Sequence, residues 1–156
     1  KLCEFFRISL DKNAQGKSTI QKELELLDVY LSIEKVRFGD RLQVSMDVSG
    51  DTLSAKIPSM LLQPLVENAV KYAIEPKKEP GTIRLSSKLE GGRLVLSVMD
   101  DGSGNKTELE TGLGIGLNNT RERLSMMFND DCEVDLTTNH QGGTTVLIRI
   151  PFVNGR

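Results

Sequence analysis

The chain of 156 residues has no tryptophan, only two cysteines and one histidine, and its aromatic content is 4%. Cys3 and Cys132 are too few for a disulfide framework, so we interpret them as reduced thiols typical of a cytosolic protein. No apolar run approaches the roughly 20 residues of a membrane-spanning helix, and no signal peptide is visible. The formal net charge of −2 gives no support for nucleic acid or an anionic membrane as the main partner.

The length fits one domain with an appended segment, large enough to form a core without disulfides or metals. The sequence begins without Met, in a stretch typical of the middle of a helix. We therefore expect a fragment, and the lack of a membrane span here says nothing about the parent protein.

Glycine, by contrast, is concentrated. Five glycines fall between positions 102 and 116, where average usage of roughly 7% predicts about one. They lie in Asp100-Asp101-Gly102-Ser103-Gly104 and Gly112-Leu113-Gly114-Ile115-Gly116-Leu117, separated by the polar stretch 105–111. Such clusters indicate positive φ angles or a backbone held close to a ligand. A strand is expected before them at 94–99 and a helix after them at 117–128. This layout suits a phosphate-bearing ligand, because free amides at a helix start favour anions.

Hydrophobic periodicity predicts the order β–α–β–β–α–β–β from residue 42 onward, which favours a mixed sheet with helices on one face. The expected strands are 42–48, 82–90, 93–100, 133–138 and 144–151. Turns are expected at Gly50-Asp51, Gly91-Gly92 and 140–143.

Residues 1–38 are expected to form two helices outside the main core, at 1–12 and from Ser18 to Gly39. Gln21 takes the capping-box position of the second helix. Its buried face is predicted from the regular spacing of Ile20, Leu24, Leu27 and Leu31. Its charged residues are interpreted as a solvated face: Glu23, Glu25, Asp28, Glu34, Lys35 and Arg37.

The helix expected at 59–73, opened by Pro58-Ser59, has two distinct faces when drawn at about 100° per residue. The apolar face holds Leu62, Leu65, Val66, Ala69, Val70 and Ala73. The opposite face holds Glu67, Asn68, Lys71 and Tyr72. Carboxylate and amide oxygens suit Mg²⁺, a lysine suits a phosphate, and a tyrosine can stack. The same face also fits an ordinary solvated helix surface.

Asp100 ends the apolar strand, where its carboxylate can accept a hydrogen bond from a ligand amino group, worth about 1.5–3 kcal/mol. A turn-initiating aspartate is equally compatible with this position, and Asp101 fits that role.

Together these stretches resemble the GHKL ATP-binding family of gyrase, heat-shock chaperone, histidine kinase and mismatch-repair ATPases. The residues Glu67-Asn68-Ala69-Val70-Lys71-Tyr72 resemble its N-box. The two glycine clusters resemble its glycine motifs, and Gly142-Gly143-Thr144 resembles its final element. Each motif alone is weak, whereas all four in order are specific. The stretches LLQPLVENAVKYAI, GLGIGLNNTRERL and ELELLDVYLSIEKVRFGDRL are similar to LytS/YesM-type sensor histidine kinases, over nearly the whole chain.

The resemblance implies a GHKL, or Bergerat-type, α/β fold of the α+β two-layer sandwich kind. Residues 39–156 would form the ATP-binding domain, and residues 1–38 the C-terminal part of a dimerisation and phosphoacceptor region. The cofactors would be ATP and Mg²⁺.

The resemblance also implies residue roles. Asn68 would bind Mg²⁺, and Asp100 would accept from the adenine amino group. Glu67, as the catalytic residue, would act as a base or orient a water. Residues 105–111 would form the ATP lid. The implied nucleotide-binding set is Asn68, Lys71, Tyr72, Asp100, Gly102, Gly104, Gly112, Gly114, Gly116, Leu117 and Thr144.

Three departures from the family pattern stand out. Pro64 replaces an Asn of many histidine kinases but fits the LytS-like pattern, and Lys71-Tyr72-Ala73 replaces Lys-His-Gly. The only histidine, His140, lies in an expected turn, so the phosphoacceptor histidine would lie outside this chain.

The leading hypothesis is the ATP-binding catalytic domain of a two-component sensor histidine kinase that phosphorylates a histidine outside this chain. The parent would be a homodimeric integral membrane protein with this domain in the cytoplasm, and would pass the phosphate to a response regulator. One alternative is a GHKL ATPase acting as a conformational machine, in which Glu67 activates water, although the lid is short. Another is a non-catalytic nucleotide-binding or interaction module, although the motif set is complete. Arg121 and Arg123 are left open between phosphate binding and simple solvation.

Overall fold

The computed structural model describes residues 16–102, 114–138 and 142–155, and five of its strands form one mixed sheet. Their spatial order is β2 (Leu42–Val48), β4 (Gly81–Glu90), β5 (Arg93–Asp100), β7 (Thr144–Pro151) and β6 (Glu133–Thr138). Strand β2 runs parallel to β4, and all other neighbours are antiparallel. The expected strands are therefore confirmed, to within one residue at each end.

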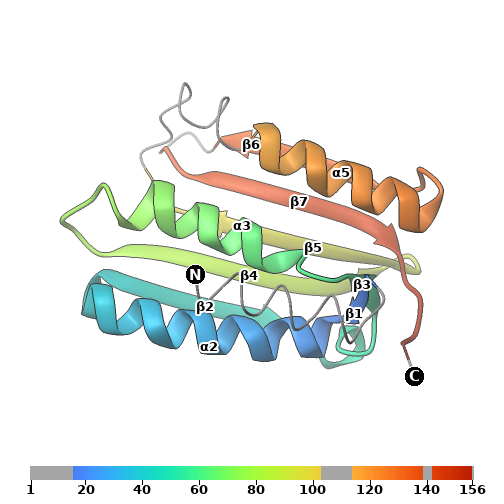
Figure 1. The fold of residues 1–156 in the computed structure, drawn as a ribbon, viewed down its shortest axis with the longest axis horizontal. Helices are drawn as coiled ribbons and strands as arrows, with labels where there is room; N and C mark the ends of the chain where they lie inside the picture. The colour runs from blue at the N-terminus through green and yellow to red at the C-terminus, as the bar shows by residue number, and fades with distance from the viewer. Residues whose placement is uncertain (1–15, 103–113, 139–141, 156) are drawn as a thin grey trace.

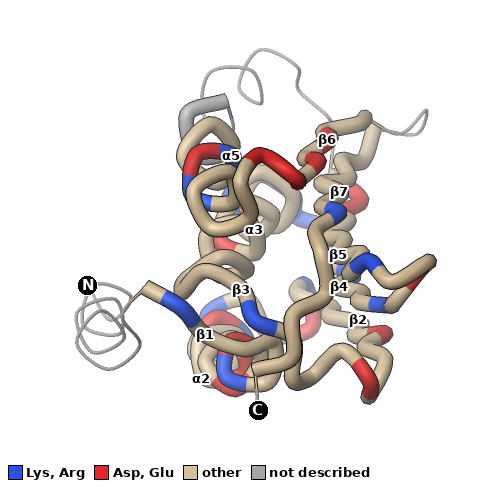
Figure 2. The backbone as a smooth tube through the Cα atoms, turned by 90° about the vertical axis from the view of Figure 1, so that its right-hand side faces the viewer, with Lys and Arg blue, Asp and Glu red and all other residues tan. Residues whose placement is uncertain are grey.

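Three helices of the described chain cover one face of this sheet, so the molecule has two layers (Figures 1 and 2). They are α2 (Ile20–Phe38), α3 (Leu62–Ala69) and α5 (Gly114–Phe128). Helix α3 continues into a π-helical turn, η3 (Val70–Ile74), and short 3₁₀ turns lie at η1 (Gly39–Arg41) and η2 (Gly50–Thr52). The expected mixed sheet with helices on one face is confirmed.

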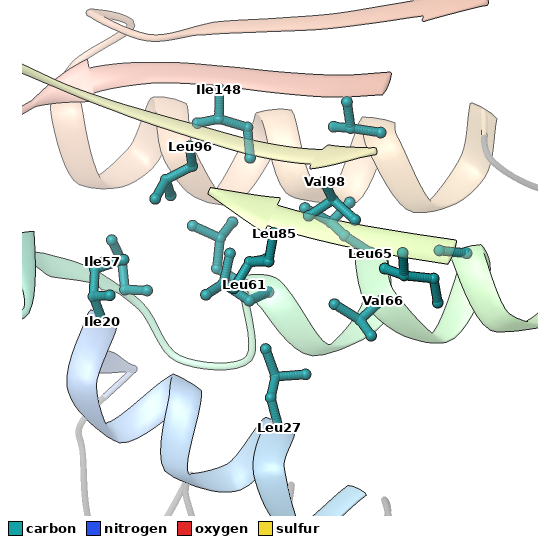
Figure 3. Close-up of a cluster of buried hydrophobic side chains, with 14 of the residues drawn as sticks. Ile20, Leu27, Ile57, Leu61, Leu65, Val66, Leu85, Leu96, Val98 and Ile148 are labelled. Carbon is teal, nitrogen blue, oxygen red and sulfur yellow. The ribbon is translucent and has the colours of Figure 1, made fainter. Parts of the chain in front are cut away.

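One hydrophobic core fills the space between the two layers (Figure 3). Alternate residues of each central strand point into it, because successive side chains of a strand face opposite sides. On β5 these are Leu94, Leu96 and Val98, each at most 4% exposed. The helices contribute residues such as Leu27, Leu65 and Leu124 to the same cluster.

A second, two-stranded sheet was missing from the sequence prediction. It pairs β1 (Lys17–Thr19) with β3 (Lys56–Pro58) in antiparallel register. Three-residue strands are too short to show a periodicity. The C-terminal segment packs beside this small sheet, since the Lys56 amide donates to the Val153 carbonyl at 2.8 Å.

Helix α2 corrects the expectation for the N-terminal region. Thr19 caps it, its side chain accepting from the Lys22 amide at 3.3 Å, while Ser18 lies in β1. The prediction that this helix lies outside the main core is wrong, because Ile20, Leu27 and Leu31 belong to the core cluster. The helix expected at 1–12 lies outside the described residues.

At the sheet edge, β2 is less buried than its alternation predicts. Leu42 is 1% exposed, but Val44 and Met46 on the same face are 39% and 43% exposed. None of the helices in the described ranges is long and apolar enough to span a membrane.

Candidate nucleotide-binding site

Helix α3 and its extension η3 present the two faces that the sequence predicts. All six residues of the apolar face are buried, each at most 4% exposed. On the opposite side, Glu67, Asn68 and Tyr72 are half-buried and Lys71 is exposed. Polar groups are therefore available beside the core without being buried in it.

This helix is not regular over its whole predicted length. It begins at Leu62 rather than at Ser59, and from Val70 it widens into a π-turn. The Glu75 amide donates to the Val70 carbonyl at 3.0 Å, an i→i+5 bond. The spacing of 100° per residue used to assign the two faces is therefore valid only as far as Ala69. π-Turns inside helices are frequent at functional sites.

Two side chains of the polar face have defined partners. The Gln63 Nε2 group donates to Glu67 Oε1 at 3.3 Å, and Gln63 itself is 1% exposed. The buried amide one helical turn earlier thus orients the Glu67 carboxylate. The Lys71 ammonium lies 5.3 Å from the centre of the Tyr72 ring, within cation–π range.

Asp100 lies at the end of β5, opposite Thr144 of β7. Its Oδ1 atom accepts from the Gly102 amide at 2.9 Å. Burial raises the pKa of Asp100, while backbone hydrogen bonds from Gly102 and Thr144 lower it and only partly offset the burial. A carboxylate offers about four acceptor positions, so Asp100 retains acceptor capacity for a ligand amino group.

Gly102 brings the first glycine motif against the extension of helix α3. A Cβ atom on Gly102 would lie 3.0 Å from the Ala73 Cβ atom, 3.1 Å from the Ala73 Cα atom and 2.9 Å from Asp100 Oδ1. Only glycine fits this approach without displacing a neighbour. The end of β5 and the segment carrying the predicted N-box are therefore in direct contact.

Asp101 contacts both β4 and the loop that precedes it. Its Oδ1 atom accepts from the Thr82 amide at 2.8 Å, and the Lys77 ammonium donates to its carbonyl at 2.6 Å. These bonds join the loop after η3 to the end of β5.

The described part of the second glycine motif, from Gly114 onward, opens helix α5. Gly114 starts the helix, three residues before the predicted start, so Gly116 also lies in its first turn. Amides of a first turn have no partner within the helix and favour anions. Leu117 is 2% exposed and packs in the core. The predicted residues Gly104 and Gly112, the lid 105–111 and His140 lie outside the described residues.

Sequence reasoning missed the groups that hold the ends of the α3–η3 segment. Glu23, predicted to be solvated, is 2% exposed and accepts from the Met60 amide at 3.0 Å and the Leu62 amide at 3.4 Å. At the other end, Arg41 donates to the carbonyls of Ile74, at 3.0 Å, and of Lys77. Nothing in the sequence indicated these contacts, because the helix was expected to begin at Ser59, whereas its N-cap in the structure is Leu61, which has no capping side chain.

The two arginines of α5 that were left open have protein partners. Arg123 donates to the carbonyls of Met60, at 3.2 Å, and of Ser59. Arg121 donates to the Val134 carbonyl at 3.2 Å. Arg123 is half-buried against these carbonyls, whereas Arg121 is exposed and so also fits the solvated interpretation.

The described residues offer two features that suit an adenine nucleotide. Asp100 supplies a partly buried hydrogen-bond acceptor. Gly102 has no side chain, so its backbone lies close to both Asp100 and Ala73. Within the described ranges, no three His, Cys, Asp or Glu residues form a group able to hold a metal. A divalent ion here would take most of its ligands from phosphates and water, as Mg²⁺ commonly does.

Comparison with protein families gives two matches. The family described as histidine kinase-, DNA gyrase B- and HSP90-like ATPase matches residues 53–154. The chain belongs to this ATPase family. A second family, described as histidine kinase, matches residues 1–42. The division predicted after residue 38 stays a prediction.

Curated relatives of this chain are named as sensor histidine kinases or sensor proteins. The sensor histidine kinase YesM of Bacillus subtilis is 37% identical over 139 residues, which cover 87% of this chain and 24% of the relative. The sensor protein LytS of Staphylococcus saprophyticus is 33% identical, over 99% of this chain and 28% of the relative. The chain thus spans about a quarter of the length of these relatives.

Solved structures confirm the fold of the ATPase domain. The catalytic domain of the histidine kinase ThkA has a TM-score of 0.65 at 15% identity, covering 87% of this chain and 94% of that one. The Acinetobacter baumannii histidine kinase AdeS has a TM-score of 0.63 at 20% identity, covering 98% and 78%. The predictions of the GHKL family and of its two-layer fold are confirmed.

Proposed function

We propose that this chain is the ATP-binding catalytic domain of a sensor histidine kinase, transferring the γ-phosphate of ATP to a histidine outside residues 1–156. One observation carries the proposal: Gly102, whose amide donates to Asp100 at the end of β5, packs against Ala73 in the α3–η3 segment that bears Asn68 and Lys71. The family match and the sensor-kinase relatives support it.

In this proposal, Asp100 accepts a hydrogen bond from the adenine amino group beside Thr144, and Gly102 permits the close approach. Lys71 exchanges its contact with the Tyr72 ring for a phosphate oxygen, and Tyr72 flanks the adenine or ribose. Amides near Gly114, Gly116 and Leu117 hold phosphate oxygens.

Asn68 contributes its side-chain oxygen to Mg²⁺. When bound there, Mg²⁺ would supply the positive charge that phosphoryl transfer needs to offset the phosphate oxygens. Glu67, oriented by Gln63, receives the proton of the attacking group or positions a water. This part of the proposal rests on the position of Glu67 beside Asn68.

The partners belong to the same proposal. They are the phosphoacceptor helix of a parent kinase, a response regulator that receives the phosphate, and a second copy of the parent in a homodimer. We further propose that the parent is an integral membrane protein with this domain in the cytoplasm. The support is the naming of the relatives as sensor histidine kinase and sensor protein.

A transfer assay with γ-labelled ATP tests the proposal. The chain alone should show no stable phosphoprotein, and a separately supplied parent segment with the acceptor histidine should become labelled. Strong labelling of His140 would contradict the assignment. Steady release of phosphate without labelling of the acceptor would favour the ATPase alternative, in which Glu67 activates water.

A further inference from the structure

The first turn of helix α3 has no cap of its own. Its N-cap residue, Leu61, makes no side-chain hydrogen bond to the first turn. The first four amides of any helix lack partners within the helix, and leaving buried amides unpaired is costly. Since Met60, Leu61 and Leu62 are each at most 6% exposed, water does not readily replace a cap here.

Glu23 supplies this cap from another helix. Its two carboxylate oxygens accept from the Met60 and Leu62 amides, at 3.0 and 3.4 Å. A negative charge at a helix N-terminus is also favoured by the helix dipole. Burial raises the pKa of Glu23, and the backbone hydrogen bonds and the positive charge of Arg123 oppose this rise. The backbone amides of Met60 and Leu62 thus partly compensate the cost of burying the Glu23 carboxylate.

Arg123 binds the carbonyl groups of the segment that precedes helix α3. Its guanidinium donates to Met60 O at 3.2 Å and to Ser59 O. Met60 has φ +60°, a left-handed conformation that is strained outside glycine. Such conformations persist when the surroundings fix them from several sides, and here the Met60 amide and carbonyl are both held.

We propose that Glu23 and Arg123 form a clamp on residues 59–62 that sets the position of helix α3, and with it Asn68 and Lys71, for Mg·ATP. Glu23 comes from α2 and Arg123 from α5, the helix that starts in the second glycine motif. The clamp therefore joins the N-box helix to the helix that follows the glycine motif. Both are positioning residues, and the inference rests on the proposed function.

The placement of α3 matters because displacing a protein group that positions the substrate by about 1 Å can reduce a catalytic rate about a hundredfold. Asn68 lies less than two helical turns beyond Leu62, so a shift at the helix start moves it directly.

The test compares Glu23→Gln with a control that removes core packing elsewhere. Glutamine keeps the shape but turns one acceptor into a donor facing a backbone amide. The control is Ile150→Ala, at 0% exposure. It lies about 20 Å along β7 from Thr144, since each strand residue advances about 3.3 Å. Both variants are examined by urea unfolding, Mg·ATP calorimetry and the NMR signals of the Asn68 side-chain amide.

We expect Glu23→Gln to weaken Mg·ATP affinity at least tenfold and to shift the Asn68 amide signals. Ile150→Ala should lower stability with affinity within twofold of wild type and unshifted signals. Arg123→Lys keeps the charge but not the paired contacts, so it should also weaken Mg·ATP affinity and shift the Asn68 signals. It replaces Glu23→Gln in the test if that variant does not fold. Affinity within twofold of wild type in the folded clamp variant would overturn the inference.

A separate outcome distinguishes this inference from the proposed function. If the wild-type chain binds no Mg·ATP, the proposed function fails. The clamp is then judged on the Asn68 signals alone: a shift in Glu23→Gln but not in Ile150→Ala supports it, and no shift overturns it.

Discussion

At the scale of single residues, Gly102 shows how one missing side chain builds the site. Its backbone does not need a positive φ, so conformational freedom does not explain the glycine. The explanation is space: the nearest atoms are those of Ala73 and Asp100, at 2.9–3.1 Å from where a Cβ would lie. The sequence located this residue by its motif, but its neighbour Ala73 became visible only in the fold.

Replacement of Gly102 by alanine should destabilise the chain by about 1–3 kcal/mol, because the added methyl group overpacks the contact with Ala73. Gly50→Ala is the matched control, since nothing lies within 4 Å of its added Cβ. Urea unfolding of both variants checks this. Equal stability losses in the two variants would contradict the packing argument.

Asp100 gives a pH-dependent prediction at the same scale. Burial raises its folded-state pKa above the ordinary value of 3.8. Its contribution to the free energy of unfolding is therefore fully present below that value and lost as the pH rises through the folded pKa. In urea unfolding from about pH 4 to about pH 7, wild type should lose stability relative to Asp100→Asn. The account would be contradicted if the stability of wild type relative to Asp100→Asn stayed constant or increased as the pH rises.

At the scale of elements, strands and helices differ in how much their sequence reveals. Alternation placed five strands to within a residue, because half-buried strands carry their pattern locally. Helix α3 was predicted to start too early because its cap, Glu23, lies 37 positions before Met60. A local pattern does not distinguish a solvated glutamate from one buried against another helix. The same reasoning missed Arg41, which holds the other end of the segment.

Helix α2 should behave as part of the ATPase core. Leu27→Ala, at a site with 0% exposure, should cost about 2–5 kcal/mol in unfolding free energy. Val36→Ala on the same helix, at 88% exposure, should change it by less than about 0.5 kcal/mol. Denaturant titration of both variants is the measurement. A small effect of Leu27→Ala would indicate that the helix is dispensable to the core.

At the scale of the whole molecule, the site draws on segments far apart in the chain. Strand register sets Asp100 opposite Thr144, and close packing sets Gly102 against Ala73. The motifs predicted the participants, since each has its own residue pattern. They did not predict that α2 and α5 jointly hold the helix between them, because this depends on side chains meeting across the core.

Calorimetric titration with ATP and Mg²⁺ tests the central claim most directly, using wild type, Asp100→Ala and the control Ile150→Ala. We predict that wild type and the control bind one nucleotide with similar affinity. Asp100→Ala should bind about 2 kcal/mol more weakly, roughly thirtyfold, through loss of a charged hydrogen bond. Equal affinity in all three proteins, or no binding by wild type, would contradict the account.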